Sequence, residues 1–520
     1  MTGQTFIDIV QQQARARPTA LAYRCGDRRW TFADVERDTN RIANTLAALG
    51  LGRGDRVAAL TKFHVEAALL TLAAAKLGAV CMPVNWRLAP AEVRYIVDHG
   101  GAKLMMADRG FLPLVDRAGM PTLQQVVVTD GEDVGTHDGL PGFHDWYAAA
   151  SDVMTPVSVK PEDPMLQLYS SGTTGLPKGV QLMHRNLLAH LAFIDAGAFG
   201  HWVPDDLQLI CLPLFHVGGT DSLLWSFYTG SQVLLLRDAA AQTIVDAFRA
   251  HRVTIAGFVP TIMAMVLDHP DTAGLDFSAL RLVSYGGSPI SPELLQQAYA
   301  TFGCRFQQLF GMTEATGGVV MLADEDHRGD PALLKACGRP LPTTQLKVVD
   351  SDGHALQAGE VGEIAVRSPT MMKGYWQRPE ETAKAFRDGW YLTGDAGNFD
   401  AQGYLYIRDR IKDMVVSGGE NIYPTEVEIA LRRHPDVAEV AVIGVPDPKW
   451  GEAVKAVVVR QPGSALDDVG LIAFARTYLA GFKCPKSVDF VAELPKNAAG
   501  KVLRRELRKQ YWSGNERQVG

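Results

Sequence analysis

The 520-residue chain is poor in cysteine and has no excess of positive charge. Its six cysteines are scattered and form no C-x-x-C pair, so we expect buried thiols in a reducing compartment, the cytoplasm. The formal net charge is −7, which argues against a nucleic-acid-binding protein, because such proteins usually carry a basic surface. With 47% hydrophobic and 21% charged residues, the composition is typical of a soluble globular protein.

The sequence also lacks long apolar runs. The longest, "VEAALLTLAAAKLGAVCMPV" at residues 65–84, is interrupted by Glu66 and Lys76, and it favours a buried helix followed by a strand over a membrane span. The N-terminal segment "MTGQTFIDIVQQQARARP" has no apolar core of a secretory signal. We therefore expect no transmembrane segment. A peripheral membrane contact would suit a lipid substrate, although the basic helix near the C-terminus is more simply a solvated face.

The length exceeds what one compact core holds, so two or more domains are expected. Over about the first 400 residues, short apolar runs such as "DRVAAL" and "LRLVSYGG" alternate with amphipathic helical runs, which predicts a layered α/β domain with largely parallel sheets. One such helix is expected to begin at Thr31, a suitable N-cap, and to end at Gly50, a suitable glycine after the C-cap.

The pattern changes after Gly338, where apolar and polar residues alternate around a turn at Asp352-Gly353 and predict a β-rich subdomain. "DSDG" resembles the start of a calcium loop, but the glutamate-terminated spacing is missing, which favours the turn. A small α+β unit follows "IRDRIKDMVVSGGE", with a helix that has Pro424 near its first position, two strands, "VAEVAVIGVP" and "EAVKAVVVR", and a basic helix near the end.

The stretch "YSSGTTGLPKGV" at residues 169–180 is dense in glycine, hydroxyl side chains and one lysine. Unblocked backbone N–H groups, hydroxyls and an ammonium suit a polyphosphate, and a flexible surface turn is the alternative. A Walker A loop is disfavoured, because counting from Gly172 places Pro177 at the second glycine and Gly179 at the Ser or Thr.

This loop is similar to the phosphate loop of the adenylate-forming acyl-CoA synthetase superfamily. Five more motifs of that family recur in order along the chain: "LPLFHVGG" at Leu212–Gly219, "FGMTEAT" at Phe310–Thr316, "YLTGDAG" at Tyr391–Gly397, "DRIKDMVVSGGENIYPTEVE" at Asp409–Glu428 and "PKNAAGKVLRREL" at Pro495–Leu507. The resemblance implies an N-terminal domain over residues 1–408, a hinge over 409–413 and a small mobile C-terminal domain over 414–520.

The family joins a carboxylic acid to AMP, using ATP and Mg²⁺, and then passes the acyl group to coenzyme A. Negative charge accumulates in both steps, so the site must supply cations and N–H donors. The resemblance implies that Thr313 contacts the α-phosphate and that Glu314 holds Mg²⁺, a hard cation suited to carboxylate and phosphate oxygens. The β- and γ-phosphates would be held by Ser170, Ser171, Gly172, Thr173, Thr174, Gly175 and Lys178.

The nucleoside and the moving lysine are also placed by the resemblance. Asp395 and Arg410 would bind the ribose hydroxyls. The adenine would be flanked by Gly286 and Gly287 in "SYGGSP" and by Phe310, although the two glycines alone would suit a plain turn at a strand end. Gly311 would also belong to the nucleotide site. Lys501 matches the catalytic lysine, whose ammonium can bridge the substrate carboxylate and the α-phosphate. Lys412 matches the hinge residue about which the C-terminal domain rotates, and Gly418 and Gly419 would line the pantetheine tunnel.

The sequence says least about the residues that bind the acid. The resemblance places His216 there, also among the catalytic residues, although it could be a core histidine. The other pocket residues would be Gly218, Gly219, Phe258, Gly286 and Leu309. Since no Asp or Lys stands out to pair with an amine, we expect an apolar acid, in first place a medium- or long-chain fatty acid. Aryl and alicyclic acids, a carrier protein as the acyl acceptor, and a non-catalytic nucleotide-binding module stay open, whereas a phosphotransferase would produce ADP.

Overall fold

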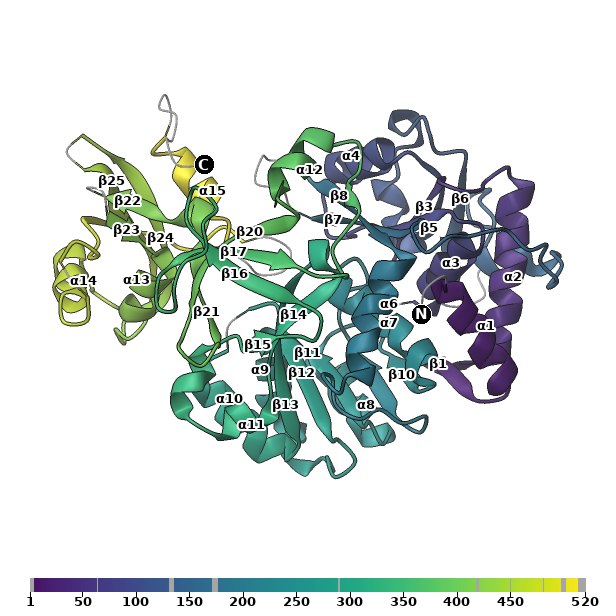
Figure 1. Ribbon diagram of the computed structural model, residues 1–520, viewed down its shortest axis with the longest axis horizontal. Helices are drawn as coiled ribbons and strands as arrows, with labels where there is room; N and C mark the ends of the chain where they lie inside the picture. Colours follow the sequence, from purple (N-terminus) through teal and green to yellow (C-terminus); the bar gives the residue numbers. More distant parts are fainter. Residues whose placement is uncertain are drawn as a thin grey trace. The chain divides into compact units, whose positions relative to one another are not determined.

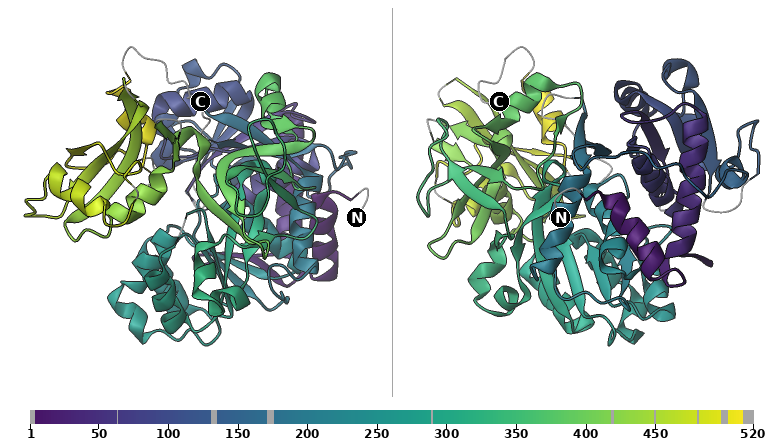
Figure 2. Two further views of the ribbon diagram at one scale, coloured as in Figure 1. Left: turned by 60° about the vertical axis from the view of Figure 1, so that its left-hand side comes forward. Right: turned by 45° about the vertical axis from the view of Figure 1, so that its right-hand side comes forward.

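The computed structural model describes residues 4–62, 64–130, 135–170, 176–288, 290–417, 420–448, 450–479, 481–496 and 502–512. It divides into two compact units, each drawn in Figures 1 and 2. Unit 1 comprises Met1–Gln345 and Arg367–Tyr391, and unit 2 comprises Leu346–Val366 and Leu392–Gly520. The layered α/β architecture expected from the alternation of strands and helices is confirmed. The domain boundaries at residues 408 and 413 stay a prediction.

The first sheet of unit 1 has seven strands in the order β18-β8-β7-β4-β3-β5-β6. The strands from β7 to β6 in this order are parallel, and β8 and β18 are antiparallel additions. Their bounds are β3 Arg56–Leu60, β4 Val80–Pro83, β5 Ala102–Asp108, β6 Gln125–Thr129, β7 Pro164–Ser170, β8 Lys178–Met183 and β18 Gly374–Tyr375. The helices that precede β7 in the chain are α1 Phe6–Ala16, α2 Phe32–Ala48, α3 Val65–Lys76, α4 Pro90–Gly100 and α5 Phe143–Ala148.

The second sheet of unit 1 has nine strands in the order β15-β14-β13-β12-β11-β9-β10-β1-β2. Its six strands from β13 to β1 are parallel. The bounds are β1 Leu21–Cys25, β2 Arg28–Thr31, β9 Leu207–Ile210, β10 Gln232–Leu235, β11 Ile255–Phe258, β12 Leu282–Gly286, β13 Arg305–Met312, β14 Gly317–Leu322 and β15 Arg339–Pro340. The helices that follow β8 in unit 1 are α6 His184–Asp195, α7 Val217–Thr229, α8 Ala241–Ala250, α9 Pro260–Leu267, α10 Pro292–Phe302, α11 Asp324–Arg328 and α12 Pro379–Ala385, the last of which packs against β18.

Two separate hydrophobic cores cover the two faces of the nine-stranded sheet. One contains Val283, Tyr285 and Phe306 together with residues of α8, α9 and α10. Leu309 and Met321 pack instead against the core that contains residues of α6 and α7. Because successive side chains of a strand point to opposite faces, odd and even positions of β12 and β13 belong to different environments.

The apolar run at residues 65–84 forms α3 followed by β4, as predicted, and all twelve residues of α3 are buried. Within the described ranges, no helix combines the length and apolar character needed to cross a membrane. All six cysteines are buried thiols, as expected. Burial on every side explains why α3 has no polar face.

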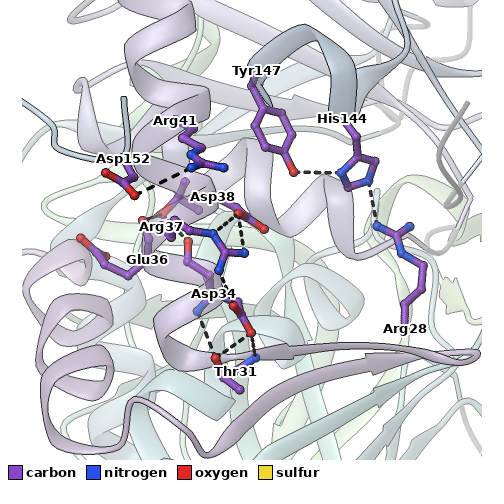
Figure 3. Close-up of polar contacts among 12 residues, drawn as sticks. Arg28, Thr31, Asp34, Glu36, Arg37, Asp38, Arg41, His144, Tyr147 and Asp152 are labelled. Atoms are coloured by element: carbon purple, nitrogen blue, oxygen red, sulfur yellow. Dashed lines mark hydrogen bonds and ion pairs between the residues drawn. The ribbon is translucent and has the colours of Figure 1, made fainter. Parts of the chain in front are cut away.

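The helix predicted from Thr31 to Gly50 is α2, which lies beside α1 (Figures 1 and 2). The Thr31 hydroxyl accepts a hydrogen bond from the Asp34 N–H, and the Asp34 carboxylate accepts one from the Thr31 N–H (Figure 3). This capping box satisfies two backbone donors at the helix start. At the other end Gly50 has φ +78°, the left-handed conformation that favours glycine.

A buried acid lies close to α2. Glu66 is 1% exposed and accepts hydrogen bonds from Arg28 and His144, and His144 is in turn bonded to the Tyr147 hydroxyl at 2.9 Å. Figure 3 shows the contacts of His144 with Tyr147 and with Arg28, the second at 2.8 Å. Burial by itself would raise the pKa of Glu66, but the His144 hydrogen bond and the Arg28 charge outweigh it and lower this pKa to about 2. Glu66 is therefore ionised and paired inside unit 1.

Unit 2 contains most of one five-stranded sheet and all of another. The first consists of β16 Gln345–Val349, β17 Gly362–Arg367, β19 Phe386–Arg387, β20 Trp390–Phe399 and β21 Leu405–Arg410. The second consists of β22 Val415–Ser417, β23 Glu420–Ile422, β24 Val437–Asp447, β25 Gly451–Arg460 and β26 Ser487–Phe490, with helices α13 Pro424–Leu431, α14 Asp468–Ala475 and α15 Arg504–Lys509. Asp352-Gly353 lies in a turn, as predicted, and Gly353 has φ +89°.

Candidate active site

The phosphate loop is flanked by two antiparallel strands of unit 1. Ser170, the last residue of β7, lies opposite Lys178, the first residue of β8. The strands therefore fix both ends of the loop. Five of the predicted phosphate-binding residues lie outside the described residues: Ser171, Gly172, Thr173, Thr174 and Gly175.

Glu314 lies beside one end of this hairpin, although it is 144 residues further along the chain. Its Oε1 accepts a hydrogen bond from the Ser170 hydroxyl at 3.1 Å and another from the Tyr375 hydroxyl at 3.1 Å. Tyr375 is delivered by β18, which pairs with β8. The carboxylate is only 9% exposed, and two hydroxyl donors fix its position. Carboxylate and hydroxyl oxygens are ligands that suit Mg²⁺, so the side chains fit the predicted metal.

Lys178 is held by a second set of contacts. Its ammonium forms an ion pair with Glu381 of α12 and lies 5.0 Å from the centre of the Tyr375 ring. Tyr375 therefore touches both the predicted metal-binding carboxylate and the predicted phosphate-binding lysine. The sequence analysis missed Tyr375 and Glu381, because they lie in "GYWQRPEET", outside the six motifs.

The predicted adenine-binding glycines lie where backbones approach closely. A Cβ on Gly286 would be 2.4 Å from the Leu309 carbonyl oxygen, and one on Gly311 would be 1.9 Å from the Gly317 carbonyl oxygen. Gly287 is exposed and has φ +80°, so a side chain there would be strained. These glycines are needed for the packing of β12, β13 and β14. Phe310 and Thr313 are half-buried next to them, at the end of β13 and in the 3₁₀ turn Thr313–Ala315.

His216 precedes α7 and lies against Phe215, with ring centres 4.6 Å apart. Its side chain is reachable by solvent. The protein around the ring removes much of its hydration and, together with the Arg87 charge, lowers the pKa of His216 to about 4. The imidazole is therefore neutral at physiological pH. It is not the core histidine that the sequence left open.

The glycines after His216 differ in their surroundings. Gly218 is exposed, and a Cβ there would only touch Leu212 at 3.8 Å. Gly219 is buried, and a Cβ there would be 2.3 Å from the Pro213 carbonyl oxygen. Packing of α7 on the preceding loop therefore explains Gly219, whereas Gly218 leaves open space.

The structure does not bring Phe258 to the same sheet face as Leu309. Phe258 is 2% exposed and packs on Phe302 in the core formed with α8, α9 and α10. Its neighbour Gly257 points the other way, and a Cβ there would touch Leu212, as one on Gly218 would. In β11 the position on the Leu212 side is therefore Gly257, one residue before the predicted Phe258.

The predicted ribose-binding residues lie in unit 2. Asp395 of β20 is buried and is directly opposite Arg410 of β21 in the antiparallel ladder. The Asp395 N–H donates to the Thr393 hydroxyl at 3.1 Å, and Gly394, with φ +71°, donates its N–H to Glu363. The side chain of Arg410 is not among those described.

Lys501, Gly418 and Gly419 lie outside the described residues, and Lys412 is placed only by its backbone, in the 3₁₀ turn Ile411–Asp413. The segment after Lys501 is firmly anchored within unit 2. Arg504 of α15 donates to both carboxylate oxygens of Glu428, at 2.8 and 2.9 Å, and Arg508 donates to Asp413 at 2.7 Å. These contacts tie the flank of the lysine segment to α13 and to the predicted hinge.

Comparison with known proteins identifies the class. Residues 10–376 match the model of the AMP-binding enzyme family, and residues 426–501 match that of the AMP-binding enzyme C-terminal domain. Among relatives, the chain is 40% identical to fatty acid–[acyl-carrier-protein] ligase ScoC of Streptomyces coeruleorubidus, over 99% of this chain and 98% of that one. It is 37% identical to a feruloyl-CoA synthase of an Amycolatopsis species, over 96% of this chain and 98% of that one.

Among solved structures, ATP-bound MatB from Rhodopseudomonas palustris superposes with a TM-score of 0.87 at 31% identity, over 98% of this chain and 99% of that one. The fold and the matched domains thus define an ATP-dependent ligase that joins an acyl or aryl acid to a thiol. The chain belongs to the AMP-binding enzyme family, the adenylate-forming acyl-CoA synthetases.

Proposed function

We propose that this enzyme activates a medium- or long-chain fatty acid in two steps. The acid carboxylate attacks the α-phosphorus of ATP, forming acyl-AMP and releasing pyrophosphate. The thiol of coenzyme A then attacks the acyl carbon, forming the thioester and releasing AMP, while the thiol proton passes to solvent. The first step converts a poor leaving oxygen into part of AMP, a good one.

The observation that carries this proposal is the hydrogen bond between Ser170 and Glu314. It joins the first hydroxyl of the phosphate hairpin to the carboxylate of "GMTEA", although 144 residues separate them. In the proposed site Glu314 and the Ser170 hydroxyl would hold Mg²⁺, which would neutralise charge on the phosphates. Lys178 and the loop after Ser170 bind the β- and γ-phosphates, and Thr313 the α-phosphate.

The remaining roles follow the family motifs. Asp395 and Arg410 bind the ribose, and Gly286, Gly287, Phe310 and Gly311 flank the adenine. Lys501 supplies a positive charge to the carboxylate and the α-phosphate during adenylation. Lys412 serves as the hinge, and Gly418 and Gly419 admit the pantetheine. Since His216 is neutral, it can line the acid pocket with Gly218 and Leu309 without adding charge.

The acid is proposed to be apolar because the side chains of β12 and β13 nearest to the proposed pocket are Ser284, Gly286, Gln307 and Leu309, none of which carries a charge. The similarity to ScoC supports a fatty acid, and the similarity to a feruloyl-CoA synthase keeps an aryl acid as an alternative. The buried thiols suit the cytoplasm, where ATP and coenzyme A are available.

An acyl carrier protein is the alternative to coenzyme A as the acyl acceptor, because ScoC is named as a fatty acid–[acyl-carrier-protein] ligase. The test is a screen of pyrophosphate release over short- to long-chain, aryl and alicyclic acids, run with coenzyme A and separately with a phosphopantetheinylated carrier. The proposal predicts AMP and pyrophosphate, with thioester formed on coenzyme A. Thioester formed only on the carrier would favour this alternative, and ADP as the product would refute both.

A further inference from the structure

A cavity of about 670 Å³ lies in unit 1 between the segment after α6 and the strands β12, β13 and β14. Leu282, Gln307 and Met321 line it from the sheet, and Ala198 and Trp202 line it from the opposite side. No part of the family motifs accounts for it.

The charged side chains that line it have hydrogen-bond or ion-pair partners, and Asp324 pairs with Arg328. Arg305 donates to Glu325 at 2.8 Å, and Asp195 accepts a hydrogen bond from the Tyr228 hydroxyl. His201 also lines the cavity, and its apolar wall is formed by Ile194, Ala198, Trp202, Leu282 and Met321. We take this apolar wall as the part that would contact a hydrocarbon chain.

The cavity lies on the same face of the sheet as the proposed acid pocket. Along β12, side chains at Leu282, Ser284 and Gly286 share one face, because the side-chain period of a strand is two residues. Their partners on β13 are Arg305, Gln307 and Leu309, in that order. Met321, which lines the cavity, is paired with Leu309.

Along the two strands, the pair Ser284 and Gln307 lies between the pair Leu282 and Arg305 and the pair Gly286 and Leu309. Gln307 is 4% exposed, lines the cavity, and donates its side-chain N–H to the Ser284 hydroxyl at 2.7 Å. Ser284 and Gln307 lie two residues, about 7 Å, from Gly286 and Leu309 of the acid pocket. We call this pair the Ser284–Gln307 wall.

We propose that the Ser284–Gln307 wall closes the far end of the acid pocket and so limits the enzyme to medium-chain acids, while the cavity behind it would take the end of a longer chain. This inference rests on the proposed function. The wall would act as a specificity determinant, because shortening Gln307 would remove the side chain that lies between the proposed pocket and the cavity.

The test measures kcat/KM for AMP formation with coenzyme A over straight-chain acids from butanoate to octadecanoate. Gln307→Ala should move the optimum to longer acids, and the longest should gain about tenfold or more, since one methylene in an apolar pocket is worth at least that much. Gln307→Leu keeps the volume without the hydrogen bond and should keep the wild-type optimum. If Gln307→Ala does not fold, Gln307→Ser takes its place and should likewise move the optimum to longer acids.

Gln308→Ala is the matched control. Gln308 is adjacent on β13 but accepts a hydrogen bond from Tyr285 on the opposite face, so its loss should leave the chain-length profile unchanged. An unchanged profile in Gln307→Ala and Gln307→Ser, with AMP still formed, would overturn the inference alone. Absence of AMP with every acid, in the wild type as well, would instead refute the proposed function.

Discussion

Ser170 donates a hydrogen bond of 3.1 Å to Glu314, and through it the start of the phosphate hairpin is joined to the 3₁₀ turn after β13. The Tyr375 hydroxyl donates to the same oxygen. A carboxylate held by two hydroxyls is fixed in position before any ligand arrives. Preorganised charge of this kind is worth more than the same charge on a mobile side chain.

The first prediction concerns this carboxylate. Glu314→Gln keeps the shape of the side chain but removes the charge proposed to hold Mg²⁺, so acyl-AMP formation should fall by about a hundredfold or more. Tyr375→Phe removes only one of the two hydroxyl donors and should cost about tenfold or less. Pyrophosphate release at saturating ATP measures both. Equal activity of Glu314→Gln and wild type would remove Glu314 from the mechanism.

The second prediction separates the two half-reactions. Lys501→Ala should abolish acyl-AMP formation from acid and ATP, because the proposed bridging charge is lost. Thioester formation from supplied acyl-AMP and coenzyme A should be largely retained. Rapid-quench measurement of each half-reaction gives the answer, and equal loss of both would contradict a role confined to adenylation.

The third prediction concerns Arg504. Replacing it with Met leaves the buried Glu428 carboxylate without its bidentate partner, which costs about 3 to 5 kcal/mol of unfolding free energy when a buried pair is broken. The neighbouring Arg505 is exposed, so Arg505→Met should change stability by less than about 0.5 kcal/mol. Urea unfolding of the two variants compares them directly. Similar stabilities would show that the anchor of the C-terminal helix is unimportant.

The fourth prediction is a pH dependence of stability. The folded pKa of Glu66 is about 2, below its ordinary value of 4.5, so its ion pair stabilises the folded state fully above about pH 4.5. That contribution is lost as the pH falls from about 4.5 to 2. At neutral pH Glu66→Gln should therefore lower the free energy of unfolding by on the order of 3 kcal/mol.

Exposed Glu162 provides the control for this experiment, since Glu162→Gln should change little at any pH. Urea unfolding between neutral pH and pH 3 should show the stability of Glu66→Gln approaching that of the wild type as the solution becomes acidic. A difference that stays constant with pH would mean that the charge of Glu66 contributes nothing.

Much of the fold could be predicted from the sequence because the ends and types of many helices and strands depend on a few neighbouring residues. Thr31 and Gly50 bound α2, and the largely apolar run at residues 65–84 divides into α3 and β4. Such signals depend on capping and on side-chain period, which are properties of a few neighbouring residues.

Contacts between distant segments could not be predicted in this way. Tyr375 reaches Glu314 only because β18 adds to β8, and Arg504 reaches Glu428 from 76 residues away. Phe258 illustrates the same limit at one position. The sequence named Phe258, but the register of β11 against β12 pairs Gly257, not Phe258, with Ser284.

The central claim is that the carboxylate oxygen of the acid attacks the α-phosphorus of ATP. The most direct measurement uses an acid labelled with ¹⁸O in its carboxyl group, ATP, Mg²⁺ and coenzyme A, followed by mass spectrometry of the nucleotide products. The account predicts one ¹⁸O atom in the phosphate of AMP and unlabelled pyrophosphate. Label in inorganic phosphate, together with ADP, would contradict it.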